Sequence, residues 1–256
     1  MRSAAPAAPP ATEESSATSS TTRPPSTGSS APGAEATGSS ATPVTVAPAA
    51  GLDTSPTPSP PTDGSEPADI GGREVTDTGY APYARVGDVV LHHPGGVVEL
   101  IGFHQSNHEG AQPQESVDGS ARAMELASRG RGSSSRSAAD IVTRPGTEIR
   151  AVVTGVVDRA SAYTLYCDVL DEYLVIVPDG APDLEVKLLH VVGLRVAPGD
   201  RVVAGVTPVA DGVHTLPFAS QVDDETGNPS WGHVHVEVVD TRIPNVPNGN
   251  SGSDDC

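Results

Sequence analysis

From Tyr80 onward, short apolar runs rich in Val, Ile, Thr and Leu alternate with Gly, Pro and Asp turn signals. Runs of this length and composition are typical of β-strands. The segment from Met124 to Arg136 is the one candidate for a helix or loop. Many short strands at this spacing predict an all-β fold, an antiparallel sandwich or a partly open barrel. We expect strands near 86–92, 97–103, 148–158, 162–167, 172–178, 183–191, 201–204 and 233–239.

The N-terminal part of the chain has a different composition. Residues 1–50 contain 42 that are Ala, Gly, Pro, Ser or Thr, and no aromatic residue precedes Tyr80. Such a segment cannot bury enough apolar surface to offset the entropy lost on ordering. We therefore predict a disordered Ala/Pro/Ser/Thr-rich stalk over 1–79, a β domain over 80–243 and a flexible tail over 244–256.

The charge balance excludes some partners. The chain has 33 acidic and 15 basic residues, a formal net charge of −18, so it lacks the positive field of a nucleic-acid binder. It also lacks an apolar run of the roughly 18 residues that a transmembrane segment needs. The stalk is typical of a link between a membrane or wall attachment and a folded domain, and we expect an extracellular or cell-surface location. The first residues show no secretory signal, so a cytosolic chain with a floppy tail is the alternative.

The only two cysteines are Cys167, in an apolar strand-like run, and Cys256, the last residue. One interpretation is a buried thiol and a free terminal thiol. The other is a disulfide that ties the tail to the core, which would favour an exported protein.

The chemistry-bearing motif is Trp-Gly-His-Val-His-Val-Glu-Val near the C-terminus. Alternate residues of a strand share a face, so His233 and His235 project side by side while Val234 and Val236 face the core. Two such imidazoles can supply one metal ligand and one proton acceptor. Glu237 continues the same face and can orient a histidine. The alternative is two half-exposed histidines on an edge strand.

Two further residues extend this pattern. His190 ends an apolar strand run, where a histidine taken alone is more often a packed core residue. Asp140 starts an apolar strand in which a carboxylate is otherwise out of place, although it can also be a turn or capping residue.

The order of these elements resembles the lysostaphin/LytM-type zinc peptidases over residues 124–240. The motifs are Asp140 with Pro-Gly-Thr-x-Ile-x-Ala-x-x-x-Gly-x-Val, then His190, then Val-x-x-Gly-Asp-x-Val-x-x-Gly, then Gly-His-x-His and Glu-Val. The resemblance implies a β-rich catalytic domain with Zn²⁺ as cofactor. It implies Asp140 and His235 as zinc ligands and His190 and His233 as the catalytic pair. It also implies hydrolysis of peptide cross-links in cell-wall peptidoglycan by a zinc-bound water.

The chain departs from this family at one position. The family's first zinc ligand is a histidine four residues before the aspartate, and here that residue is Arg136, which cannot bind zinc. We expect His104 to supply the third ligand because it follows the end of a strand, with His108 as the alternative. Otherwise zinc binds through Asp140, His235 and water alone. In a further alternative the domain is a catalytically inactive module that binds wall peptides or regulates another wall hydrolase.

Other polar residues are expected to have ordinary roles. His92 and His93 are adjacent in a predicted strand and cannot enter one site together. His214 is expected to face solvent from a turn. The acidic residues of one predicted turn are expected to be solvated: Asp168, Asp171 and Glu172. Four arginines form a basic patch that serves ion pairing or contact with an acidic peptide or wall polymer: Arg122, Arg129, Arg131 and Arg136.

Overall fold

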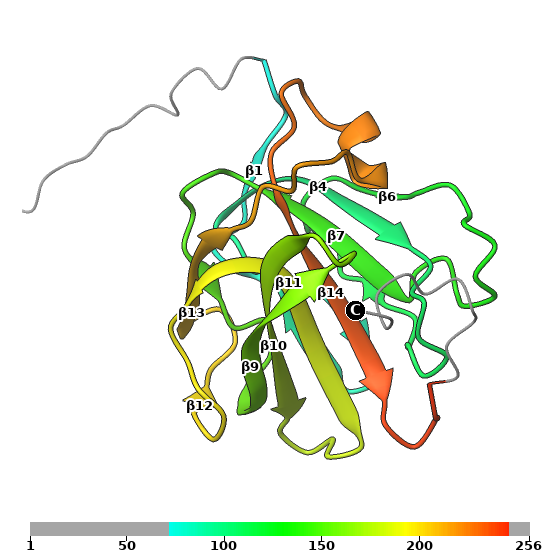
Figure 1. Cartoon of the computed structure of the whole chain (residues 1–256), viewed down its shortest axis with the longest axis vertical. Helices are drawn as coiled ribbons and strands as arrows, with labels where there is room; N and C mark the ends of the chain where they lie inside the picture. The colour runs from blue at the N-terminus through cyan, green and yellow to red at the C-terminus, as the bar shows by residue number, and fades with distance from the viewer. Residues whose placement is uncertain (1–71, 246–256) are drawn as a thin grey trace, which may run out of the picture. The chain divides into compact units, whose positions relative to one another are not determined.

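The computed structural model describes residues 72–245 (Figure 1). This part of the chain is built from β-strands and contains no α-helix, only one short 3₁₀-helix, η1 (Gln221–Glu225). No helix among these residues has the length and apolar character needed to cross a membrane. The predicted stalk up to residue 71 and the predicted tail from residue 246 lie outside the described residues.

Residues 72–245 form fourteen strands, most of them short. They are β1 (Thr76–Asp77), β2 (Pro82–Val86), β3 (Val89–His92), β4 (Val97–His104), β5 (Glu115–Ser116), β6 (Ala123–Glu125), β7 (Ala138–Thr143), β8 (Ile149–Arg150), β9 (Gly155–Leu165), β10 (Val169–Pro178), β11 (Leu184–Leu194), β12 (Arg201–Val202), β13 (Pro208–Val213) and β14 (His233–Asp240).

The strands form two sheets, which confirms the predicted all-β class. The large sheet runs in the order β1-β4-β7-β14-β11-β10-β9-β12, with β6, β8 and β13 paired beside this path. The small sheet has the order β3-β2-β5. All pairs are antiparallel except β4 with β6, and the large sheet does not close into a barrel. Figure 1 shows β4, β7, β14 and β11 side by side in the centre.

One face of the large sheet packs against the small sheet. Tyr83 and Leu91 of the small sheet share a buried cluster with Phe103 of β4 and with Val234 and Val236 of β14. This confirms the predicted inward orientation of the two valines. Because strand residues alternate between faces, His233 and His235 lie on the opposite face of the sheet.

Several strand boundaries differ from the expectation. Residues 86–92 are not one strand, because the chain turns at Gly87, which has a φ of 55°, and joins β2 to β3 as a hairpin. The segment 148–158 is likewise interrupted, and β9 continues to Leu165. Strand β13 was not predicted. Its sequence, PVADGV, carries Pro, Asp and Gly, which are depleted in strands.

The folded region begins before residue 80. Strand β1 pairs with β4, and Arg73 forms an ion pair with the buried Glu99 at 2.7 Å. The segment from Met124 to Arg136 contains no helix. Its first residues belong to β6, and a loop leads from there to β7.

The close pairing of β9 with β10 depends on Gly155. A Cβ at this position would lie 2.1 Å from the carbonyl oxygen of Val177, so a side chain would force the two backbones apart. We expect Gly155→Ala to destabilise the domain by about 2 kcal/mol and to lower its Tm by roughly 4–8 °C. Thermal unfolding followed by circular dichroism measures this.

Gly212 in β13 provides the matched control. It is also buried, but a Cβ there would meet its nearest atoms at 3.8 Å, an ordinary contact distance. Gly212→Ala should change the Tm by less than about 2 °C. Equal losses of Tm in the two variants would contradict the steric explanation.

Candidate metal centre and histidine cluster

The register of three neighbouring strands places a carboxylate between two imidazoles. Strand β7 lies between β4 and β14, and Asp140 of β7 is directly opposite His235 of β14. His104, the last residue of β4, is opposite Ala138, which lies two residues before Asp140 and on the same face of the sheet. The residue of β4 opposite Asp140 is Gly102.

His104, Asp140 and His235 form a cluster that could hold a metal ion. One ligand atom from each residue lies within 4.8 Å of the other two. Asp140 Oδ1 is 3.1 Å from His104 Nε2 and 2.9 Å from His235 Nδ1. Ligand atoms around a tetrahedral ion with bonds of about 2 Å lie roughly 3.3 Å apart. The two distances from Asp140 are close to this spacing.

The ring of His104 directs an unpartnered nitrogen into this cluster. Its Nδ1 lies 3.1 Å from the carbonyl oxygen of Gln105, and because a carbonyl only accepts, Nδ1 carries the proton. In the neutral form of the ring, Nε2 holds a lone pair. This atom is buried and has no hydrogen-bond partner in suitable geometry, although the carboxylate of Asp140 is close. A metal cation would satisfy a lone pair held in this way.

Charge in the cluster is balanced between the carboxylate and the imidazoles. Burial alone would raise the pKa of Asp140, but His233, His104 and the hydrogen bond from His235 hold it well below its usual value. Burial alone would lower the pKa of His235, but the hydrogen bond with Asp140 and the nearby carboxylate of Glu237 raise it to about 9. A proton on His235 and a cation in the cluster are thus alternative ways to neutralise Asp140.

Glu237 supports the cluster from the side, on the face predicted for it. Its Oε2 lies 3.9 Å from His235 Nε2 and accepts a hydrogen bond from Ser106 Oγ at 2.6 Å. Lys187 Nζ lies 3.1 Å from Oε1. Burial opposes ionisation, but His235 and Lys187 hold the pKa of Glu237 far below its ordinary value.

His233 lies beside the cluster on the same face as His235. Its Nε2 is 3.8 Å from Asp140 Oδ1, and its ring packs edge-on against that of His190, with 5.2 Å between centroids. Burial lowers the pKa of His233 to about 4, against the opposing influence of Asp140. The side chain is therefore neutral at pH 7.

His190 reaches this face through a β-bulge. On β11, Leu188 and Val191 both face the core, so two residues lie between them where a regular strand would have one. The pairing with β10 shifts at the same place, because Tyr173 pairs with Leu189 but Glu172 pairs with Val191. His190 is the extra residue and has a φ of 64°. A left-handed backbone costs a non-glycine residue roughly 1 kcal/mol, and such bulges often redirect side chains beside functional sites.

Asp171 of β10 holds His190 in place, and the sequence interpretation of this aspartate was wrong. It is not in a solvated turn but is 2 % exposed. It accepts hydrogen bonds from His190 Nδ1 and Tyr163 Oη, each at 2.6 Å, and from His214 Nδ1 at 3.1 Å. Burial raises the pKa of Asp171, but these hydrogen bonds outweigh it and lower the pKa to about 2.

His214 was also misjudged, because it is half-buried against Asp171 and does not point freely into solvent. Its backbone N–H donates to the carbonyl of His190 at 2.8 Å. One sequence signal was available for this network. A carboxylate in the apolar run Val-Leu-Asp-Glu-Tyr-Leu-Val-Ile-Val is as unexpected as Asp140 is in its own strand.

Arg136 and the alternative ligand His108 both lie outside the cluster. Arg136 does not take the place of a ligand. It stacks on Phe103, with its guanidinium carbon 3.6 Å from the ring centroid, and donates to the carbonyl of Gln114. Phe103 faces the core side of β4, opposite to His104. The alternative ligand His108 also lies outside the cluster, where its Nδ1 accepts a hydrogen bond from the backbone of Gly110.

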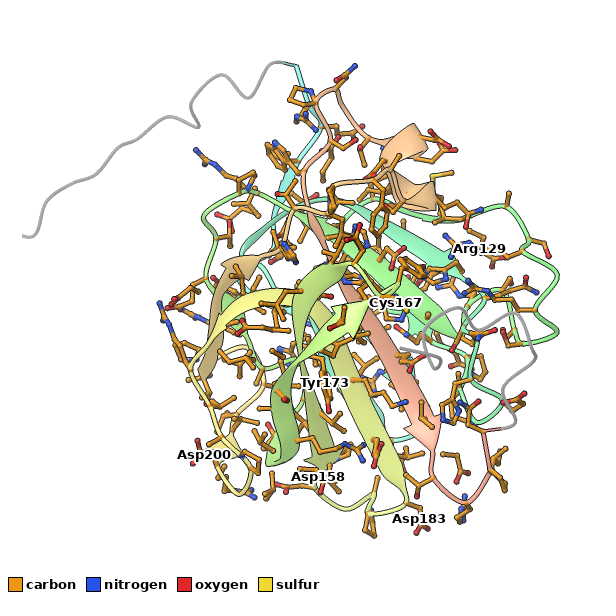
Figure 2. All side chains as sticks on the ribbon, in the orientation of Figure 1. Arg129, Asp158, Cys167, Tyr173, Asp183 and Asp200 are labelled. Carbon is orange, nitrogen blue, oxygen red and sulfur yellow. The ribbon has the colours of Figure 1, made fainter. Side chains whose placement is uncertain are left out.

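Cys167 lies in the turn between β9 and β10, labelled in Figure 2. It is disulfide-bonded, which excludes the interpretation as a buried thiol. The chain's other cysteine, Cys256, lies outside the described residues.

The geometry predicts that His104 is a metal ligand and His108 is not. We expect the purified chain to bind one equivalent of Zn²⁺ or Co²⁺. His104→Ala should weaken this affinity at least about 100-fold, because losing a ligand costs more than losing a residue that supports one. Isothermal titration calorimetry measures the affinity.

His108→Ala is the matched control, since it removes an imidazole four residues away and should leave the metal affinity within about two-fold. Thermal unfolding of both variants checks that the fold is retained. Wild-type affinity in His104→Ala would contradict the assignment of this ligand.

Comparisons of the chain with family models, with curated proteins and with solved structures found no match.

Proposed function

We propose that this protein is a zinc-dependent endopeptidase of the lysostaphin/LytM type that hydrolyses peptide cross-links in bacterial peptidoglycan. The observation that carries the proposal is the meeting of His104, Asp140 and His235 on one sheet face with His190 and His233 beside them. These residues come from four strands and span more than a hundred positions. The motif order of the sequence supports the same family.

The donor set favours zinc among the divalent metals. Two imidazole nitrogens and one carboxylate oxygen form a common ligand set of catalytic zinc, which keeps a further position open. His104, Asp140 and His235 would hold the ion, and the unpartnered Nε2 of His104 supports this fit. A zinc ion bound there would lower the pKa of a water molecule to about 7 and so supply a nucleophile at neutral pH.

The two remaining histidines have distinct tasks in this proposal. The Nδ1–H group of His190 donates a hydrogen bond to Asp171, so Nε2 is free to take a proton from the attacking water. His233 would donate a hydrogen bond to the carbonyl oxygen as negative charge develops on it. The peptide C–N bond then breaks, the carbonyl carbon keeps the oxygen of the water, and the proton passes to the leaving amine.

The position of Arg136 supports an active site over the inactive module. An arginine directed into the cluster would place a fixed positive charge where the cation must bind. Arg136 is instead engaged by Phe103, Gln114 and Glu125. Its replacement of the family's histidine is thus compensated by His104 on the neighbouring strand.

A cell-surface location belongs to the same proposal. Wall peptides lie outside the cell, and the disulfide at Cys167 fits an oxidising compartment. The Ala/Pro/Ser/Thr-rich N-terminal part of the sequence is suited to a spacer between an attachment point and the catalytic domain.

Incubation of purified peptidoglycan with the full chain tests the activity, with new amino groups measured as the product. We expect release that a chelator stops and Zn²⁺ restores. His190→Ala should lower the rate by about 10²–10⁴-fold, because a proton acceptor contributes that much. His92→Gln, whose imidazole lies at the end of β3 and bonds to Tyr80, should keep the wild-type rate.

The same assay separates the two candidate functions. Wild-type protein that binds zinc and wall peptides but releases no amino groups would contradict the peptidase and favour the inactive module.

Asp171 is expected to act as a positioning residue for His190. Asp171→Asn removes the charged acceptor of the His190 Nδ1 proton and should lower kcat by about 10–100-fold, with KM and zinc content unchanged. Asp168→Asn is the control, because it changes an exposed carboxylate in the adjoining turn. An unaltered kcat in Asp171→Asn would show that the hydrogen bond has no part in catalysis.

A further inference from the structure

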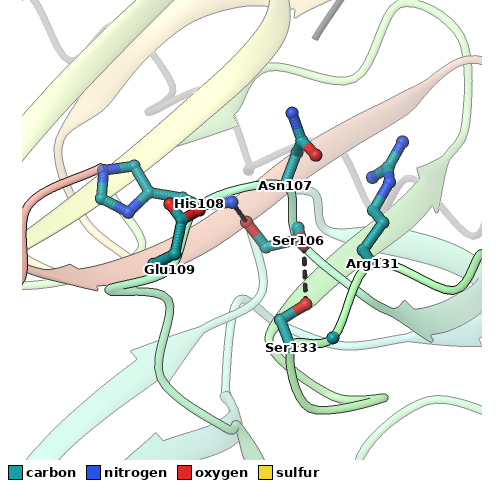
Figure 3. A pocket seen from close by; sticks show the side chains of 7 residues that line it. Ser106, Asn107, His108, Glu109, Arg131 and Ser133 are labelled. Carbon is teal, nitrogen blue, oxygen red and sulfur yellow. Dashed lines mark hydrogen bonds between the residues drawn. The ribbon is translucent and has the colours of Figure 1, made fainter. Parts of the chain in front are cut away.

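A pocket of about 290 Å³ lies between two segments of the chain, one of which starts two residues after His104 (Figure 3). One wall is the segment that directly follows His104, and the other is the loop between β6 and β7. We name it the Arg131 pocket, and its lining residues are Ser106, Asn107, His108, Glu109, Arg131, Gly132 and Ser133.

Hydrogen bonds from Gln105 fasten the two walls together. Its side-chain oxygen accepts from the backbone N–H of Arg129 at 2.8 Å, and its amide nitrogen donates to the carbonyl of Ser133 at 3.1 Å. Ser133 Oγ donates to the carbonyl of Ser106 at 2.6 Å. The loop is thereby held in a defined position against the residue next to His104.

The guanidinium of Arg131 is tied to the metal centre through one carbonyl group. Its Nη1 donates to the carbonyl oxygen of Gln105 at 3.0 Å, and the same oxygen accepts from His104 Nδ1 at 3.1 Å. Burial and the charge of Arg129 together lower the pKa of Arg131, and the nearby carboxylates of Asp140 and Glu237 act in the opposite direction. A ligand bound to this guanidinium would therefore lie next to the cluster.

Arg131 differs from the other half-buried arginines of residues 72–245. Arg73, Arg136 and Arg150 each form an ion pair with a glutamate. No carboxylate in this part of the chain lies within ion-pair distance of Arg131. A partly desolvated guanidinium with no acidic partner among residues 72–245 is suited to an external anion.

We propose that the Arg131 pocket binds a carboxylate group of the substrate, so that the enzyme selects peptides with a free carboxylate near the cleaved bond. This inference rests on the proposed peptidase function and names its substrate class. The planar guanidinium matches a carboxylate with two parallel hydrogen bonds. Asn107 extends in the same direction as Arg131 in Figure 3 and can donate a further one, while Glu109 lies across the pocket.

Binding of two matched peptides to the full chain tests this proposal. The probes are fluorescein-labelled tetra-alanine with a C-terminal carboxylate and the same peptide with a C-terminal carboxamide, followed by fluorescence anisotropy. We expect wild-type protein to bind the carboxylate at least about 10-fold more tightly. Arg131→Gln should reduce this preference to less than about two-fold.

Arg129→Gln is the matched control, since it removes a neighbouring exposed arginine that bonds to Gln221 and does not line the pocket. It should retain the preference. Equal binding of both peptides by the wild type, no binding of either, or a preference that survives in Arg131→Gln would overturn the proposal. A chain that keeps the Arg131-dependent preference but cleaves no peptidoglycan would refute the peptidase alone.

Discussion

The structure around the site is governed by the need to neutralise one buried carboxylate. Asp140 is 3 % exposed in the middle of the large sheet, where an isolated negative charge is strongly unfavourable. His235 of β14 supplies a hydrogen bond to this carboxylate, and β4 places Nε2 of His104 against the same carboxylate oxygen. The pairing register of β4, β7 and β14 therefore determines which side chains surround Asp140. A metal cation would meet the same requirement more completely than a shared proton.

The sequence predicts well those features that follow from the two-residue period of a β-strand. Alternation along β14 places His233 and His235 on one face and Val234 and Val236 on the other. Asp140 was recognisable as a carboxylate out of place in an apolar run. His104 was expected from its position after a strand, and the structure places it in the cluster, although its role as a zinc ligand stays a proposal.

Features that depend on contacts between distant strands were not predictable in this way. His190 was expected in a regular strand, but its orientation results from an extra residue that only the pairing with β10 reveals. The burial of Asp171 depends on Tyr163 of β9 and on His214, the residue that follows β13. The β2–β3 hairpin was missed because the single Gly87-Asp88 turn interrupts an otherwise continuous apolar run.

The inserted residue in β11 has a consequence for transferring such a site to another protein. Copying the five polar side chains onto a regular antiparallel sheet would leave the imidazole of His190 on the wrong side, because a strict two-residue period sends neighbours of Leu189 into the core. The irregular backbone would have to be grafted along with the side chains. In natural descendants, a one-residue deletion in this strand would abolish the arrangement, whereas many point substitutions around it would leave the geometry intact.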